Sequence, residues 1–223
     1  MDLTFTEGQR AFRAEVRDWL AEHVPADPLP SMDTAAGFER HREWERTLAT
    51  ARLSAVSWPR RYGGRDADLI EWLIFEEEYW ASGAPGRVSQ NGVFLLAPTL
   101  MTYGTEEQKR RLLPRMARAD DIWAQAWSEP EAGSDLAALR ATATPDGDGW
   151  RLTGQKTWSS RAAHADRCFG LFRTDPDARR HRGLTYFMVP LTADGVTVRP
   201  IAQLDGRHGF AEIFFDDVYA SAD

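Results

Sequence analysis

The sequence predicts an α+β protein in which an N-terminal all-α domain is followed by a small antiparallel β-sandwich or barrel domain. Two observations predict this class. Before about Asp120, apolar residues recur at helical spacing behind capping motifs, whereas after it short runs rich in aromatic and β-branched residues alternate with turns. Because the two patterns are segregated along the chain, we expect two domains, over residues 1–120 and 121–223.

The first expected helix begins near Thr6. Thr6 and Gln9 have the spacing of a capping box, in which each side chain accepts a hydrogen bond from the other residue's backbone N–H. Phe12, Val16, Trp19 and Leu20 then fall on one helix face, which predicts an apolar stripe. The His-Val-Pro sequence that follows predicts the end of this helix.

Further helical segments follow in the first part of the chain. Residues 38–51 are charged and periodic, and residues 69–80 carry another apolar stripe. Thr105 and Gln108 repeat the capping-box spacing ahead of KRRLLPRM. Since proline has no backbone N–H to donate, we expect Pro114 to interrupt or end that helix.

The second part of the chain has the pattern of strands and turns. The Asp-Gly-Asp-Gly sequence at 146–149 predicts a hairpin turn. Residues 183–190, 195–201 and 211–218 are short, apolar and rich in β-branched or aromatic residues, which predicts strands.

Composition excludes several classes of function. With 43% hydrophobic residues among 223, the chain predicts a packed core rather than disorder. A formal net charge of -7 disfavours nucleic acid or an anionic membrane as a partner. The single cysteine excludes an intramolecular disulfide and a zinc site of four cysteines. The N-terminus lacks the apolar stretch of a signal peptide, and no run is long enough for a membrane span, so we expect a cytoplasmic protein.

Five stretches carry a resemblance to a known family. They are SWPRRYGGRD, YGTEEQKRRLLP, WSEPEAGSDLAALR, GQKTWSS and FFDDV, in this order. In these stretches the chain resembles acyl-CoA dehydrogenases from about Leu3 to Val218. The SEPEAGSD and GQKTWSS blocks are the most specific elements, and their occurrence together is a strong signal.

The resemblance implies a flavin enzyme. It implies a helical domain, a middle β domain that holds FAD, and a C-terminal four-helix bundle that closes the site. Members of the family remove an α proton and a β hydride from an acyl thioester, giving the trans-2-enoyl product. The implied protein is therefore an oxidoreductase of fatty acid metabolism. An electron-transfer flavoprotein or another acceptor takes its electrons, and the complete enzyme is a homodimer or homotetramer.

The resemblance also implies roles for residues of the SEPEAGSD region. It places the strand that holds Gln125, Trp127 and Ser128 along the flavin, where backbone amides and the Ser128 hydroxyl bond the polar edge of the ring. The Glu-Pro-Glu sequence would then turn the chain away. Gly133 and Ser134 would lie near the flavin and the thioester end of the substrate, because glycine lets the backbone approach a ligand closely.

The GQKTWSS block supplies the second set of implied contacts. Trp158 would pack on the flavin ring, and Ser160 would bond near its N5 atom. We interpret Lys156 as a structural or solvated lysine rather than a catalyst. We also assign His164 and Cys168 to structure, since no set of nucleophile, base and orienting group is visible around them.

More ordinary interpretations stay open for several features. Asp135, with the serine before it, has the residue type that caps a helical turn, and Trp127 has the type of a core aromatic. Residues 94–98 are apolar enough to line an acyl pocket or to form a buried helix. The basic runs at 110–111 and 179–182 could meet CoA phosphates, although such runs are usually solvated.

No acidic residue matches the family's α-proton base by motif, so we name no catalytic residue. The resemblance places that base in the C-terminal domain, and we expect the 223-residue chain alone to be inactive. A truncated or cleaved product, a gene fragment, and a subunit that borrows its second half would each explain the end of the chain. An acyl-CoA oxidase, a flavin monooxygenase and a catalytically silent partner subunit stay as alternative functions. The acyl group, and CoA against carrier-protein thioesters, stay open.

Overall fold

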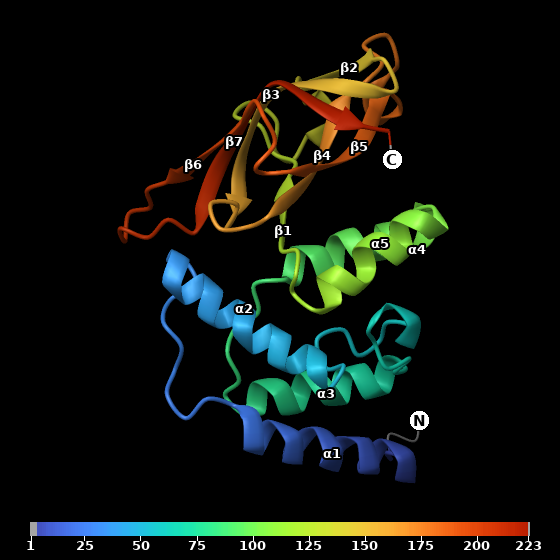
Figure 1. Ribbon diagram of the computed structural model, residues 1–223, viewed down its shortest axis with the longest axis vertical. Helices are drawn as coiled ribbons and strands as arrows, with labels where there is room; N and C mark the ends of the chain where they lie inside the picture. Colours follow the sequence, from blue (N-terminus) through green and yellow to red (C-terminus); the bar gives the residue numbers. More distant parts are fainter. Residues whose placement is uncertain (1–3, 223) are drawn as a thin grey trace. The chain divides into compact units, whose positions relative to one another are not determined.

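The computed structural model describes residues 4–222, which divide into two compact units (Figure 1). The helical unit consists of the chain up to Met32, Ala36–Ser89 and Thr99–Asp120. The sheet unit consists of Asp33–Ala35, Gln90–Pro98 and the chain from Asp121 onward. Two short segments that precede Asp120 thus belong to the sheet unit, and the division into 1–120 and 121–223 stays a prediction.

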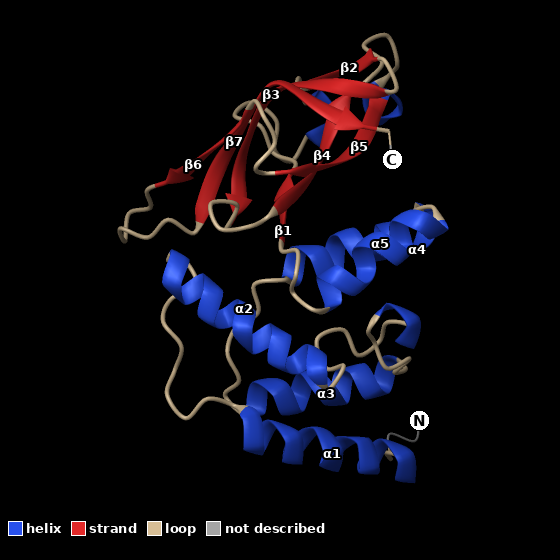
Figure 2. Cartoon of the chain, viewed as in Figure 1, coloured by secondary structure: helices blue, strands red, loops and turns tan. Residues whose placement is uncertain are grey.

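The first part of the chain is helical (Figure 2). Its elements are α1 Glu7–His23, α2 Ala35–Thr50, η1 Arg60–Tyr62, α3 Leu69–Ala81, η2 Asn91–Leu96, α4 Ala97–Tyr103 and α5 Glu106–Ala117. The predicted capping boxes at Thr6 and Thr105 are confirmed, and Asp68 with Glu71 forms another at the start of α3. In these caps, side chains satisfy backbone N–H groups that a helix leaves without partners.

Pro114 does not end α5, so this expectation was wrong. The helix continues to Ala117, with Pro114 inside it. Proline removes one hydrogen bond from the preceding turn, but only three residues of helix follow it. Leu112, Leu113 and Met116 are buried, and their packing favours continuation of the helix over an early end.

The core of the helical unit lies between α1, α2 and α3. Val16 and Leu20 of α1 pack in one apolar cluster with Leu48 of α2 and with Ile74 and Phe75 of α3. The stripe predicted for the first helix is therefore the face that this cluster buries. Burying such side chains contributes roughly 1.5–3 kcal/mol each.

The second part of the chain forms one mixed sheet. Its strands are β1 Trp123–Ala126, β2 Thr142–Asp146, β3 Gly149–Ser160, β4 Arg167–Arg173, β5 Leu184–Pro190, β6 Val196–Ile201 and β7 Phe210–Ser221. Within the described chain their order is β1-β4-β2-β3-β7-β6, and β5 pairs with β4. The sheet curls upon itself, as Figure 2 shows. The predicted class, a helical part followed by a small β domain, is confirmed.

The strand pairing differs from the antiparallel arrangement expected. β1 runs parallel to β4, with Trp123 opposite Arg167 and Ala126 opposite Gly170. Parallel neighbours need a long connection, and here the whole β2-β3 hairpin lies between them in sequence. The predicted hairpin turn itself is confirmed, because Asp146 pairs with Gly149 across a two-residue loop.

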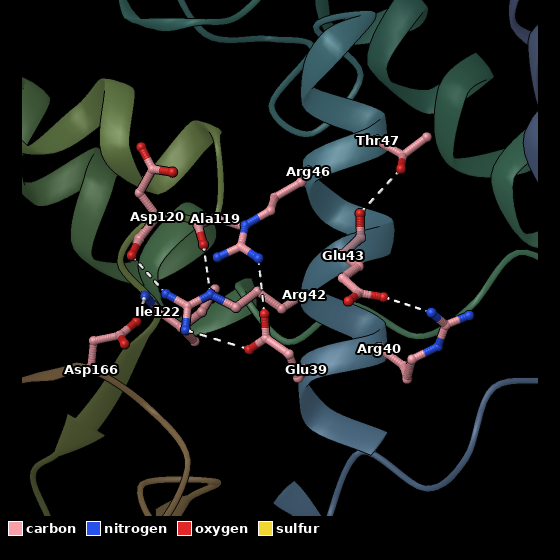
Figure 3. A network of polar contacts seen from close by, with 10 residues as sticks. All are labelled: Glu39, Arg40, Arg42, Glu43, Arg46, Thr47, Ala119, Asp120, Ile122 and Asp166. Atoms are coloured by element: carbon pink, nitrogen blue, oxygen red, sulfur yellow. Dashed lines mark hydrogen bonds and ion pairs between the residues drawn. The ribbon is translucent and has the colours of Figure 1, made fainter. Parts of the chain in front are cut away.

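The segment between α5 and β1 makes polar contacts at both of its ends, one end in the helical unit and the other in the sheet unit (Figure 3). In the helical unit, the Arg42 guanidinium of α2 donates to the carbonyl oxygens of Ala119 at 2.8 Å and Asp120 at 2.6 Å. In the sheet unit, the Asp166 carboxylate accepts from the backbone N–H of Ile122 at 2.7 Å. These bonds satisfy backbone groups at the end of α5 and the entry to β1.

None of the helices among residues 4–222 combines the length and the apolar character that crossing a membrane requires.

Candidate functional site

The two most specific sequence blocks lie side by side in the sheet unit. Gln125 lies on β1, opposite Phe169 of β4. Beyond the end of β1, the carbonyl oxygen of Ser128 accepts a hydrogen bond of 2.8 Å from the backbone N–H of Thr157 on β3. This bond places Trp127 and Ser128 beside the segment that carries Trp158.

The chain turns sharply after Ser128. Glu129 and Ala132 exchange backbone hydrogen bonds of 2.8 and 3.1 Å, with Pro130 and Glu131 at the corner between them. The turn expected from the Glu-Pro-Glu sequence is confirmed.

A β-bulge sets the orientation of Trp158. Side chains alternate along a regular strand, so Lys156 and Trp158 would face the same side. The register of β3 against β7 shifts between Lys156 and Ser159, and Trp158 has a φ of 58° in the left-handed region. Lys156 is consequently buried while Trp158 is 59% exposed. Bulges of this kind redirect a side chain, often beside a functional site.

Phe210 supports the exposed tryptophan. The rings of Trp158 and Phe210 meet edge to face, with centroids 6.0 Å apart. Ser160 is paired with Phe210 across β3 and β7. Trp158 and Ser160 therefore lie at the same end of this strand pair, and more than half of the Trp158 surface is exposed.

Gly133 and Ser134 lie on the exposed turn that follows. A Cβ built on Gly133 would meet no heavy atom within 4 Å among the described residues, and Gly133 does not have a positive φ. The backbone conformation and the packing of the described chain therefore do not require glycine at position 133. The contacts between Ser128 and Thr157 do not include this turn, so the structure brings the β1 and β3 residues together without Gly133 and Ser134.

The capping interpretation of Asp135 is wrong. Asp135 precedes the short 3-10 helix η3 Leu136–Ala138, but its side chain makes no capping hydrogen bond. It pairs instead with Arg180, at 3.0 Å. Arg180 belongs to η4 Arg180–Gly183, part of the basic run at 179–182, which is exposed as expected of a solvated run.

Lys156 forms a buried ion pair with Glu129. Its Nζ lies 2.8 Å from Glu129 Oε1, and the lysine side chain is 0% exposed. Burial lowers the pKa of Lys156, and the hydrogen bond to Glu129 opposes that effect. Of the two interpretations of Lys156, the structural one is supported and the solvated one is wrong.

The remaining singled-out residues have structural surroundings. Cys168 is buried on β4, and this burial raises the pKa of its thiol to about 12, so it keeps its proton at neutral pH. The backbone N–H of His164 donates to the carbonyl oxygen of Arg161 at 3.0 Å. Residues 94–98 lie on the π-helix η2 and the start of α4, with Phe94 and Leu95 partly exposed.

Two buried polar atoms of the site have no hydrogen-bond partner within residues 4–222. They are Nε1 of Trp127 and Oγ of Ser159. Buried polar groups are nearly always satisfied by the protein or by ordered water. Sequence reasoning missed Ser159 and Phe210. The resemblance gave a role only to Ser160, the second serine of GQKTWSS, and none to the first, Ser159. Phe210 lies 52 residues after Trp158, so spacing along the chain does not reveal their contact.

The comparisons with known proteins agree with this geometry. Residues 6–120 match the family described as acyl-CoA dehydrogenase, N-terminal domain, and residues 124–218 match acyl-CoA dehydrogenase, middle domain. The chain belongs to the acyl-CoA dehydrogenase family. A similar relative is the acyl-CoA dehydrogenase IpdE1 of Mycobacterium tuberculosis. It is 43% identical over 219 residues, which are 95% of this chain and 57% of that protein.

Solved acyl-CoA dehydrogenase structures share the fold. The ChsE4-ChsE5 complex from Mycobacterium tuberculosis matches with a TM-score of 0.84 at 34% identity, over 99% of this chain and 56% of that one. A structure described as the Tcur3481-Tcur3483 steroid ACAD matches with a TM-score of 0.85 at 33% identity, over 99% and 57%. The chain thus spans little more than half the length of these acyl-CoA dehydrogenases.

Proposed function

We propose that the sheet unit provides the flavin-contacting face of an FAD-dependent enzyme that desaturates an acyl thioester between its α and β carbons. Members of the acyl-CoA dehydrogenase family generally use FAD, and this chain belongs to that family. The observation that carries the proposal is the pairing of Ser128 with Thr157, which sets the β1 end beside the bulge that exposes Trp158.

The residues present fit a flavin. An isoalloxazine ring is planar and apolar with a polar edge, and the exposed face of Trp158 suits its plane. Ser128 and Ser160 are half-buried, and hydroxyl groups of this kind suit such an edge. The proposed cofactor-binding residues are those named from the sequence: Gln125, Trp127, Ser128, Gly133, Ser134, Trp158 and Ser160.

When bound, FAD would supply the hydride acceptor for the reaction. The residues of this chain would bind the cofactor and orient it. The Trp158 ring would hold one face of the cofactor, while Ser128 and Ser160 would donate hydrogen bonds to its edge. Such donors are fixed before the reaction, so they stabilise developing negative charge without reorganising. Gly133 would let the backbone approach the ligand closely, and Gly133 and Ser134 would lie near the thioester end of the substrate.

The substrate class proposed is an acyl thioester of CoA or of a carrier protein. One structural relative is described as a steroid ACAD, so acyl groups attached to a steroid belong among the substrates to test. We assign no catalytic base within this chain, and the α-proton base belongs to the rest of the proposed enzyme. A cytoplasmic location and an electron-transfer flavoprotein or similar acceptor complete the proposal.

The complete enzyme would be an oligomer. The ChsE4-ChsE5 structure is described as a complex of two named proteins, which supports testing for a heteromeric partner as well as for a homodimer or homotetramer. The expectation that this chain alone is inactive is part of the same proposal, since the base would come from elsewhere.

The experiment is an FAD titration of the purified protein, followed by absorption and fluorescence, beside the Trp158→Ala variant. We expect saturable binding that weakens on the order of tenfold without the ring, since base–aromatic stacking is worth about 1–3 kcal/mol. A longer natural protein containing this chain would then be mixed with short, long and steroid-linked acyl-CoA thioesters, and bleaching of the flavin band recorded. Absence of FAD binding in both proteins would overturn the proposal.

A further inference from the structure

The Glu129–Lys156 pair lies between the two segments that the proposed function assigns to flavin binding. Glu129 directly follows Ser128, and Lys156 precedes Trp158 by two residues. Both side chains are buried, Lys156 completely. Nothing in the proposed reaction requires a charged pair at this place, so its contacts need another explanation.

Every donor of the ammonium group has an acceptor. Lys156 Nζ lies 2.8 Å from Glu129 Oε1, 2.6 Å from the carbonyl oxygen of Leu171, and 3.4 Å from the carbonyl oxygen of Trp127. Lysine has three donors, and here they reach the β1 end, the turn after it, and β4. The ammonium also lies over the ring of Phe172, 4.9 Å from its centroid. Lys156 thus ties β3 to β4 and to the chain from Trp127 to Glu129.

The carboxylate of Glu129 ties in a further segment. Its Oε2 accepts from the backbone N–H of Arg140 at 2.6 Å, and its Oε1 accepts from that of Ala141 at 3.0 Å. These N–H groups lie just before β2, at the end of the segment that carries Gly133 and Ser134. Glu129 therefore fixes both ends of that segment: its own backbone bonds Ala132 and its side chain bonds Arg140 and Ala141.

A buried ion pair is a poor source of stability, because desolvation offsets most of the attraction. Its better attested effect is to specify one geometry among several, since a displaced partner leaves a charge buried alone. Here the geometry so specified is the position of the Trp127–Ser128 peptide relative to the Trp158 bulge.

We propose that Glu129 and Lys156 are positioning residues, which hold the Trp127–Ser128 peptide and the Trp158 bulge in the arrangement that binds a flavin. This inference rests on the proposed function. Neither residue touches the cofactor in this account. The pair acts by keeping the Thr157–Ser128 hydrogen bond in place. It also fixes Lys156, the residue at which the bulge begins.

The test compares FAD affinity and the visible circular dichroism of bound FAD among matched variants. Lys156→Met removes the charge with little loss of volume. Glu129→Gln removes the other charge and keeps one acceptor oxygen, which serves either Arg140 or Ala141. The double variant Glu129→Gln/Lys156→Met removes both charges. Arg151→Met is the control, because Arg151 lies on the same strand and forms an exposed ion pair with Asp146 at 2.7 Å.

We expect the Lys156→Met and double variants to raise the Kd for FAD on the order of tenfold or more, as changes behind a binding shell commonly do. The visible circular dichroism of bound FAD should also change, because the isoalloxazine ring would have a different orientation in the site. Arg151→Met should leave both readouts unchanged. The double variant should recover thermal stability lost in Lys156→Met without recovering FAD affinity.

A merely structural pair gives a different result. Folded variants with lower melting temperatures but wild-type FAD affinity and dichroism would overturn the positioning role. Where Lys156→Met does not fold, Glu129→Gln alone decides the question by the same readouts. Failure of the wild-type protein to bind FAD refutes the proposed function, whereas wild-type binding with unaltered variants refutes only this inference.

Discussion

The backbone N–H of Thr157 donates to the carbonyl oxygen of Ser128 at 2.8 Å, which joins two segments that are 29 residues apart in sequence. Ser128 lies two residues beyond the end of β1, and Thr157 directly precedes the bulged Trp158. One hydrogen bond and one buried ion pair therefore hold the Trp127–Ser128 segment beside the Trp158 bulge.

Replacing Gly133 with alanine separates ligand contact from folding. An added Cβ would meet nothing within 4 Å in the described chain, so the free energy of unfolding should change by less than about 0.5 kcal/mol. FAD or thioester binding should weaken, because the methyl group would occupy the space of the ligand. Urea unfolding and an FAD titration of the same preparation check both parts. Unchanged binding of FAD and of acyl-CoA would remove Gly133 from the site.

Replacing Trp158 tests whether the bulge that exposes this side chain holds the backbone in a strained conformation. Its φ of 58° lies in the left-handed region, which costs a residue with a Cβ about 1–2 kcal/mol. Trp158→Gly should therefore be more stable than Trp158→Ala by about 1 kcal/mol, although both lose the ring. FAD affinity should fall in both variants. Equal stability of the two variants in urea would show that the bulge carries no such strain.

Local features of the fold could be predicted, because their causes are local. The capping box at Thr6 and the turn at 146–149 depend on residues within four positions of each other, and both are confirmed. Pro114 was misjudged because packing of the last turn of α5 outweighs the local loss of a hydrogen bond. The parallel pairing of Trp123 with Arg167 depends on a long connection, which spacing along the chain does not reveal.

The candidate site could be predicted only in its parts. The resemblance named Trp158, but the positive φ that exposes it arises from a register shift against β7. The sequence indicated that Lys156 is structural or solvated but not which of the two, because its partner Glu129 is 27 residues away. Phe210 lies on β7, so its contact with Trp158 exists only in the folded sheet. These features depend on contacts between segments that are distant in sequence, and the local conformational preferences of single residues do not predict them.

Gly154 should be far less tolerant than another glycine of the same hairpin. Gly154 has a φ of 146°, and a Cβ there would lie 2.5 Å from the Cβ of Ala141. Gly147 also has a positive φ, 61°, but nothing lies within 4 Å of its Cβ position. Gly154→Ala should cost about 3 kcal/mol by overpacking and strain, and Gly147→Ala about 1 kcal/mol by strain alone. Thermal unfolding of both variants checks the ranking, which a milder effect at Gly154 would contradict.

The Glu78 carboxylate should dominate the acid sensitivity of the helical unit. Hydrogen bonds from Arg17 hold the pKa of Glu78 below its usual value of 4.5, and burial acts in the opposite direction. Arg17 Nε and Arg13 Nη1 each lie 2.9 Å from this carboxylate. Its unfolded form therefore binds a proton at a higher pH than its folded form. The stability that the carboxylate contributes is present above about pH 4.5 and is lost as the pH falls through the folded pKa.

Glu78→Gln should consequently lower the free energy of unfolding by about 1–2 kcal/mol at pH 7, since hydrogen bonds to charged groups are worth about 1.5–3 kcal/mol. The difference from wild type should shrink below pH 4. Glu77→Gln is the matched control: Glu77 also pairs with Arg13, at 2.6 Å, but its side chain is 62% exposed. Exposed pairs contribute little, so this variant should keep the wild-type pH dependence. Urea unfolding from pH 3 to 7 measures all three proteins. A constant gap between Glu78→Gln and wild type would show that packing, and not charge, is what Glu78 contributes.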